Sequence, residues 1–157
     1  TPCAHSLRRF PMPIKAGFAT LGFADVRYVD GDGLGITLAC FTMLPYWVGI
    51  HFIALVHSRR ELHALLALAG LVASDVVCML LKRLLKQDRP TSCAYLDKCD
   101  SYGMPSQHAQ FMFFLATLVY FLARRNEHVF QLGKERVLLW PVAAVVAWSR
   151  VYLGYHT

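Results

Sequence analysis

Four long apolar stretches constrain the fold of this 157-residue chain more than any other feature. A helix needs roughly 20 mostly apolar residues to cross about 30 Å of hydrocarbon. The stretches that approach this length run over residues 36–56, 62–81, 109–123 and 137–156. A soluble protein of this size has too little remaining chain to bury four such helices. The sequence therefore predicts an all-α fold, a transmembrane helical bundle with at least four spans.

The composition and the positions of proline and glycine indicate a short leader followed by a single domain. Hydrophobic residues make up 56% of the chain, and the mean hydropathy is +0.40, which is high for a soluble domain. Residues 1–33 are mixed in polarity, with three prolines and a Gly-Asp-Gly turn, so we expect them not to span the membrane. Residues 34–157 then form the domain. Because the chain starts with Thr1 and stops at Thr157 within an apolar run, we expect that domain to be truncated at its C terminus.

The charge balance indicates an anionic partner. The formal net charge is +6, and the basic residues form short clusters between apolar runs. This pattern disfavours nucleic-acid binding, because proteins that bind nucleic acid typically present a continuous basic stripe. The five cysteines form no CxxC pair or Cys/His cluster, so no metal site is predicted. Cys93 and Cys99 flank a polar loop, where a disulfide in an oxidising lumen and two free thiols both remain open.

Alternating helix directions would gather the unusual polar residues at one membrane surface. The loops 57–61 and 124–136 would lie on one side, and the leader, the loop 82–108 and the end of the fourth span on the other. Basic residues occur on both sides, so the excess of Lys and Arg in cytoplasmic loops does not select an orientation.

Three short motifs fall on that second side. They read Lys-x6-Arg-Pro from Lys82, Pro-Ser-x-His from Pro105, and Ser-Arg-x5-His from Ser149. In this order, the set resembles the three-part signature of the lipid phosphate phosphatase (type-2 phosphatidic acid phosphatase) superfamily. Each motif alone is weak, but three motifs placed together by the intervening helices are specific.

The residue types in these motifs suit a phosphoryl group. Cations and donors around its oxygens stabilise the charge that develops in the transition state. Lys82, Arg89 and Arg150 would supply three positive charges, Arg as planar forks and Lys as a point charge. Pro90 disfavours helix at Arg89 and frees its side chain to turn away from the helix. Ser106 lies at the start of the third span, where it can cap the helix and where free N–H groups attract anions.

The resemblance also implies covalent chemistry at two histidines. His156 would be the nucleophile that forms a phosphohistidine, and His108 would protonate the leaving oxygen; an imidazole suits both roles. Ser149 and His156 are seven residues apart, and we expect them to share a helix face. Arg150 is offset on that helix, so its long side chain must wrap toward the same pocket.

Other positions depart from the superfamily pattern or add to it. Gln107 stands where the superfamily usually has Gly or another small residue, and it would either crowd the phosphate or add a donor to its binding site. The resemblance also implies an acidic or amide partner for His156 about four positions after it, beyond Thr157. Asp75 would lie beneath the site or pair with a neighbouring helix, because a carboxylate in hydrocarbon is costly. Neither a metal nor another cofactor is expected.

Within the superfamily, the segments 102–112 and 149–157 are most similar to dolichyl-diphosphatases. That resemblance implies hydrolysis of dolichyl diphosphate to dolichyl phosphate at the lumenal face of the endoplasmic reticulum membrane, which recycles the lipid carrier of N-glycosylation. Two alternatives stay open. One is a phosphatase of polyprenyl diphosphate, phosphatidate or a sphingoid-base phosphate, and the other is a catalytically inactive membrane scaffold.

Overall fold

The computed structural model describes residues 17–21, 26–60, 62–90, 96, 102–125 and 137–156. The described part contains five helices and two short strands. In chain order they are β1 (Phe18–Leu21), β2 (Val26–Val29), α1 (Gly33–Thr42), α2 (Leu44–Arg59), α3 (Leu62–Leu85), α5 (Gln107–Arg125) and α6 (Leu139–Tyr152). The predicted helical fold is confirmed.

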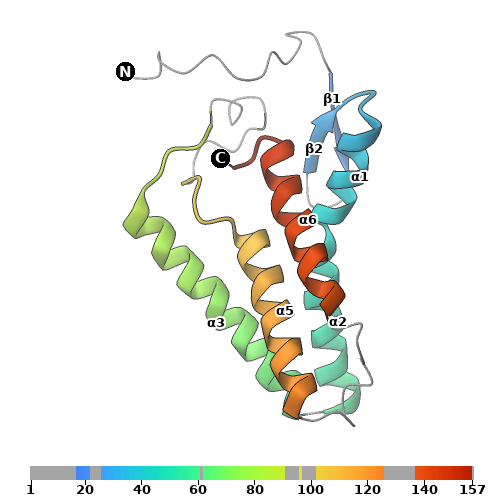
Figure 1. Ribbon diagram of the computed structural model, residues 1–157, viewed down its shortest axis with the longest axis vertical. Coiled ribbons are helices and arrows are strands. Elements are labelled where there is room, and N and C mark those ends of the chain that lie inside the picture. The colour runs from blue at the N-terminus through green and yellow to red at the C-terminus, as the bar shows by residue number, and fades with distance from the viewer. Residues whose placement is uncertain are drawn as a thin grey trace.

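The helices run side by side along the long axis of the molecule (Figure 1). α5 packs against both α3 and α6, and α1 packs against α6. α1 and α2 follow one another, with Met43 between them and Pro45 in the first turn of α2. A proline is tolerated there because the first N–H groups of a helix have no intrahelical partner.

Two segments are long and apolar enough to cross a membrane. They are 33–59, with 27 residues, and 62–85, with 24 residues, and they contain the first two predicted spans. Only 28% and 22% of their most apolar windows are buried inside the molecule, unlike the core helices of a soluble protein. The 14 residues of α6 reach about 21 Å at 1.5 Å per residue, less than the thickness of the hydrocarbon. The third and fourth spans stay predictions, because only the segments 33–59 and 62–85 of the described chain qualify.

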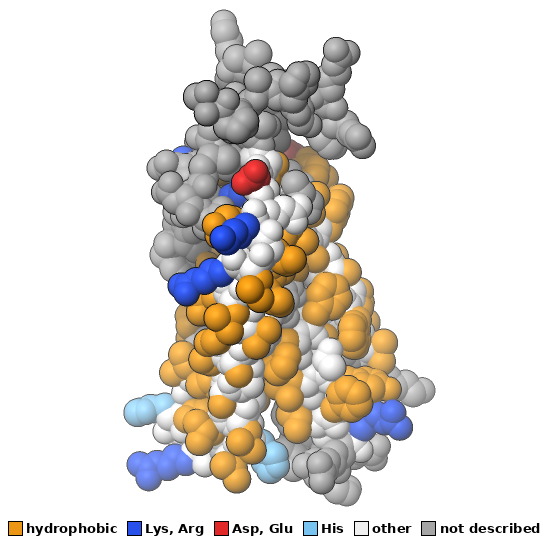
Figure 2. Space-filling model, turned by 90° about the vertical axis from the view of Figure 1, so that its left-hand side faces the viewer, with side chains coloured by type: hydrophobic (Ala, Val, Ile, Leu, Met, Phe, Trp, Pro, Cys, Tyr) orange, Lys and Arg blue, Asp and Glu red, His pale blue; other side chains and the backbone are white. Residues whose placement is uncertain are grey.

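The exposed side chains of the long helices are largely apolar. Trp47, Ile53 and Leu66 are all more than half exposed. Figure 2 shows apolar side chains over the middle of one face, with Lys and Arg toward the two ends. This distribution suits a hydrocarbon surrounding with polar boundaries.

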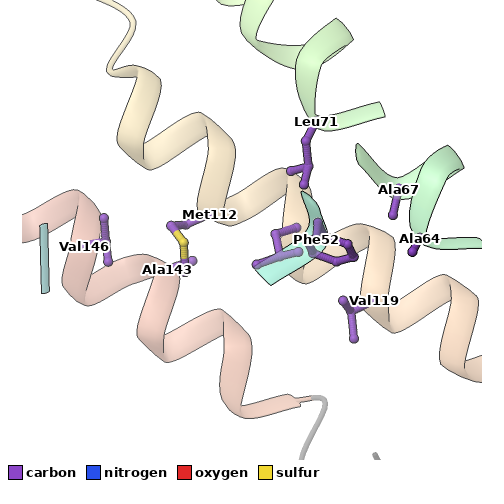
Figure 3. Packing of buried hydrophobic residues seen from close by; sticks show 9 residues of the cluster. Phe52, Ala64, Ala67, Leu71, Met112, Val119, Ala143 and Val146 are labelled. Atoms are coloured by element: carbon purple, nitrogen blue, oxygen red, sulfur yellow. The ribbon is translucent and has the colours of Figure 1, made fainter. Parts of the chain in front are cut away.

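The helices pack through a core built largely from small and aliphatic side chains (Figure 3). Met112 of α5 points toward Ala143 of α6, and Phe52 of α2 lies among residues of α3 and α5. Small residues at these contacts let helices approach closely. The buried members of the cluster are Phe52, Ala64, Ala67, Leu71, Met112, Leu115, Val119, Ala143 and Val146. This core fixes how the ends of α3, α5 and α6 lie relative to one another.

A two-stranded antiparallel sheet precedes the helices, and it was not predicted from the sequence. Phe18 pairs with Val29 and Leu21 with Val26, within the segment expected to be a leader. Val26 is buried in a second apolar cluster together with Leu153 and Tyr155, which follow α6. The sheet therefore supports the chain that leaves α6. The domain boundary at residue 33 stays a prediction.

Candidate active site

The three motifs lie at the same end of the molecule. The C-terminal end of α3, the N-terminal end of α5 and the C-terminal end of α6 all face the upper end in Figure 1. Lys82 is in the last turn of α3, His108 in the first turn of α5, and Arg150 in the last turn of α6. Arg89 and His156 lie in the segments that follow α3 and α6.

Direct contacts join the three motifs in pairs. Lys82 Nζ donates a hydrogen bond to Gln107 Oε1 at 3.2 Å, which links the first motif to the second. Arg89 Nη1 donates to the backbone carbonyl of Tyr155 at 3.2 Å, which links the first to the third. His156 Nδ1 is hydrogen-bonded to the carbonyl oxygen of Gly103, in the segment leading into the second.

Electrostatic interactions connect the same residues. The positive charges of Lys82 and Arg150 act on both imidazoles, those of His108 and His156, and His156 acts on His108. Arg89 acts on His156. The structure therefore brings the three predicted cations and the two predicted histidines into one cluster.

The end of α6 differs from the prediction, because the helix stops at Tyr152, four residues before His156. Gly154, just beyond the helix, has φ +78°, in the left-handed region. The N–H groups of Gly154 and Tyr155 donate to the carbonyls of Val151 and Arg150, the pattern of a glycine-terminated helix end. The expectation that Ser149 and His156 share a helix face is therefore wrong.

Ser149 has a structural position instead. Its side chain is fully buried, and its hydroxyl is hydrogen-bonded to that of Thr42 at 3.0 Å, which joins α6 to α1. After the turn that follows α6, the N–H of His156 donates to the carbonyl of Arg150 at 3.2 Å, which keeps His156 beside the helix end.

His156 is held in one tautomer by the chain before the second motif. A carbonyl oxygen only accepts hydrogen bonds, so Nδ1 carries the proton and Nε2 keeps a free lone pair. His156 lies beyond α6, and burial lowers the pKa of its imidazole to about 4. The hydrogen bond to the Gly103 carbonyl opposes this shift. The positive charges of Arg150, Arg89 and Lys82 reinforce it. The imidazole is therefore neutral at physiological pH, as a nucleophile must be.

Arg150 is a buried cation without an ionic partner among the described residues. Its side chain is only 7% exposed, and its guanidinium lies over the ring of Tyr155. Its Nε is buried without a hydrogen-bond acceptor in the described part of the chain. A buried charge is costly unless it is paired. The arrangement thus favours binding of an anion beside Arg150.

The hydroxyl of Ser106 does not cap α5, although the sequence suggested that it could. Its carbonyl accepts the N–H of Gln110, but its buried Oγ has no hydrogen-bond partner among the residues the structure describes. Native proteins leave few buried polar atoms unpaired, and such atoms often line a site that a ligand completes. The Ser106 hydroxyl and the Arg150 Nε are two such atoms on neighbouring motifs.

The remaining sequence predictions have mixed outcomes. The Gln107 side chain contacts Lys82, so it occupies one of the three donors of that ammonium group. Asp75 lies two helical turns before Lys82 on α3, and the charges of the two side chains interact. Cys93 and Cys99 lie outside the described residues.

Sequence reasoning missed several residues of this cluster. Gly103 contributes only backbone atoms, which no side-chain pattern reveals. Tyr46 of α2 places its ring edge-on against His108, with 5.4 Å between the ring centres, although no motif includes α2. Tyr155 contacts both arginines through different groups. Its place directly before His156 was the one available signal.

Replacing Gly103 with alanine tests how closely the loop approaches the site. An added Cβ would meet the backbone oxygen of Asp88 at 2.9 Å and Arg89 Cα at 3.2 Å, and backbone atoms cannot turn aside. We expect Gly103→Ala to cost about 1–3 kcal/mol in the free energy of unfolding, as overpacking does, and to displace the carbonyl that holds His156. Thermal unfolding in detergent measures the change.

The matched control is Gly49→Ala, because a Cβ at Gly49 in α2 meets nothing within 4 Å. This substitution should leave stability unchanged or raise it slightly, since alanine suits a helix better than glycine. Equal stability of the two variants would contradict the close approach at Gly103.

Comparison with known proteins gives the family. The model of the PAP2 superfamily matches residues 63–157, which include all three motifs. "Lipid phosphate phosphatase gamma" of Arabidopsis thaliana is 38% identical over 157 residues, covering 94% of this chain and 66% of that protein. "Dolichyldiphosphatase 1" of Homo sapiens is 32% identical over 153 residues, covering 92% and 64%. "Dolichyldiphosphatase 1" of Dictyostelium discoideum is 37% identical over 140 residues, covering 84% and 59%.

The chain spans about two thirds of the length of these curated relatives or slightly less. No solved structure matches it. The family match covers more than half of the chain and the whole cluster of cations and histidines from Lys82 to His156. This chain belongs to the PAP2 superfamily.

Proposed function

We propose that the protein is a hydrolase that releases phosphate from dolichyl diphosphate and leaves dolichyl phosphate. The observation that carries this proposal is the buried Arg150, which shares a cluster with Lys82, Arg89 and two histidines and has no ionic partner among the described residues. A terminal phosphate would compensate these charges, and the similarity to proteins named dolichyldiphosphatase supports the choice of lipid.

The first step is transfer of the terminal phosphoryl group to His156. Nε2 attacks phosphorus, the bond from phosphorus to the bridging oxygen breaks, and His108 gives a proton to that oxygen as dolichyl phosphate leaves. Lys82, Arg89 and Arg150 bind the other phosphoryl oxygens, with Ser106 and Gln107 beside them.

The second step frees the nucleophile. His108, now neutral, takes a proton from a water molecule, and the resulting hydroxide attacks the phosphohistidine. The bond from phosphorus to Nε2 breaks, and inorganic phosphate departs. His108 thus acts as an acid in one step and as a base in the next.

The proposed setting is the endoplasmic reticulum membrane, with several spans and the site facing the lumen. The apolar exposed faces of α2 and α3 suit contact with membrane lipids. The cluster lies at one end of these helices, where a lipid headgroup would meet it while the isoprenoid chain stays in the bilayer. The carrier of N-glycosylation would then be recycled on that side.

A second candidate is a phosphatase of another lipid phosphate, favoured by the 38% identity to "Lipid phosphate phosphatase gamma". Purified protein in detergent should be assayed for phosphate release from dolichyl diphosphate and from phosphatidate. We expect kcat/KM for dolichyl diphosphate to be larger by about tenfold or more, the discrimination that differences in pocket contacts typically give.

The three outcomes separate the candidates. A larger kcat/KM for phosphatidate would contradict the dolichyl assignment and retain the phosphatase. Hydrolysis of neither lipid, in protein that is folded, would support an inactive membrane scaffold instead.

A further inference from the structure

We propose that Tyr155 is a positioning residue, which holds the guanidinium groups of Arg150 and Arg89 in place for the phosphoryl group. This inference rests on the proposed function, because it assigns a task to a residue beside that site. Tyr155 is only 4% exposed, and three different parts of it contact three different segments of the chain.

The ring contacts the first arginine. Arg150 Cζ lies 4.0 Å from the centre of the Tyr155 ring, well within the range of about 6 Å for attraction between a cation and a ring face. A carboxylate in the same place would occupy the N–H donors of the guanidinium and neutralise its charge. The ring fixes the guanidinium from its face and leaves the donors at its edge available to an anion.

The backbone contacts the second arginine. The Tyr155 carbonyl accepts a hydrogen bond from Arg89 Nη1 at 3.2 Å. The place of this carbonyl is set by the turn after α6, where Gly154 adopts its left-handed conformation and Tyr155 N donates to Arg150 O at 3.0 Å. Tyr155 therefore contacts the arginines of two separate motifs and contributes to where they lie relative to each other.

The hydroxyl contacts the sheet. It accepts a hydrogen bond from the backbone N–H of Arg27 in β2 at 2.8 Å. The ring also packs in the apolar cluster that includes Val26 and Leu153. The sheet thus supports the ring through its hydroxyl, which gives β1 and β2 an indirect connection to the site.

Binding of inorganic phosphate tests the proposal separately from catalysis. Isothermal titration calorimetry of the detergent-solubilised protein gives the Kd for phosphate, and a parallel assay gives kcat and KM for dolichyl diphosphate. We expect Tyr155→Leu to weaken phosphate binding and to raise KM by about tenfold or more, because the guanidinium loses the ring that holds it. Tyr155→Phe keeps the ring and should stay within about threefold of the wild type.

Tyr152→Leu is the matched control. Tyr152 is at the end of the same helix, but its hydroxyl donates to Asp32 and its ring contacts Trp148 rather than an arginine. The control should bind phosphate as the wild type does, and thermal unfolding establishes that each variant is folded.

A second comparison covers the case in which Tyr155→Leu does not fold. Trifluorophenylalanine at position 155 has nearly the shape of phenylalanine but a ring face that attracts cations far less. It should bind phosphate more weakly than Tyr155→Phe by about twofold to fivefold. Equal affinity of these two variants would overturn the role of the ring.

The outcomes distinguish this inference from the proposed function. If the wild type binds phosphate and Tyr155→Leu binds it equally well, the inference fails whatever the lipid assay gives. If phosphate affinity depends on Tyr155 while dolichyl diphosphate is not hydrolysed, the proposed function fails and the positioning role stands. A folded wild-type protein that binds no phosphate contradicts both.

Discussion

His156→Ala is expected to abolish phosphate release from dolichyl diphosphate, with kcat lowered by about 10⁴-fold or more, as for other enzymes that lose their nucleophile. The substitution removes the Nε2 lone pair that the Gly103 carbonyl orients from the other side of the ring. The rate of phosphate release from lipid substrate in detergent measures the loss. A small change would exclude His156 as the nucleophile.

The companion variant His108→Ala separates the roles of the two imidazoles. We expect it to lower kcat by about 10²–10⁴-fold, the usual contribution of a general acid. With an aryl phosphate, whose leaving group needs no protonation, the first step should recover in His108→Ala, and phosphoenzyme should accumulate. His156→Ala should show no recovery and no phosphoenzyme. Recovery in both variants would contradict the assignment of His156 as nucleophile and His108 as acid. His51→Ala, at an exposed position of α2, is the control.

Arg150→Met is expected to lower kcat/KM by about 10²–10³-fold, the cost of removing one group that stabilises transition-state charge. The buried cation is absent from this variant, while the apolar ring of Tyr155 remains to pack against methionine. Replacing a buried charge by an apolar side chain of similar size is often neutral or stabilising. We therefore expect the melting temperature to stay the same or to rise.

This combination of lost activity and retained stability distinguishes a functional cation from a structural one. Arg150→Lys should lie between the wild type and Arg150→Met, since lysine keeps the charge but not the planar fork. Arg59→Met, in the last turn of α2, should leave activity unchanged. A large fall in stability with Arg150→Met, or activity equal to that of the wild type, would contradict a functional role of the Arg150 cation.

The sequence predicted the helices and the candidate residues better than it predicted how the site is held. The length of the apolar stretches was sufficient to predict the helices α2 and α3. The order of the three motifs was sufficient to expect Lys82 and His156 in one region. The end of α6 was missed, because the apolar pattern continues past Tyr152 and only Gly154 interrupts it. A single glycine does not reveal that it adopts φ +78° and reverses the chain.

The supporting groups were harder to predict than the charged ones. The partner of His156 in the described chain is a backbone carbonyl, which carries no residue signature. Tyr155 and Tyr46 contact site residues through their rings, and in a sequence they are indistinguishable from aromatic residues that pack helices. The strands β1 and β2 have four residues each, too few for an alternating pattern to be recognised.

A structure of the purified protein with orthovanadate, which mimics a phosphoryl group in transfer, shows directly whether His156 and the three cations bind one phosphoryl group. We predict vanadium bonded to His156 Nε2, with its oxygens in hydrogen-bond contact with Lys82, Arg89 and Arg150. Vanadate bound elsewhere, or a structure in which these cations and His156 contact no common ligand, would contradict it.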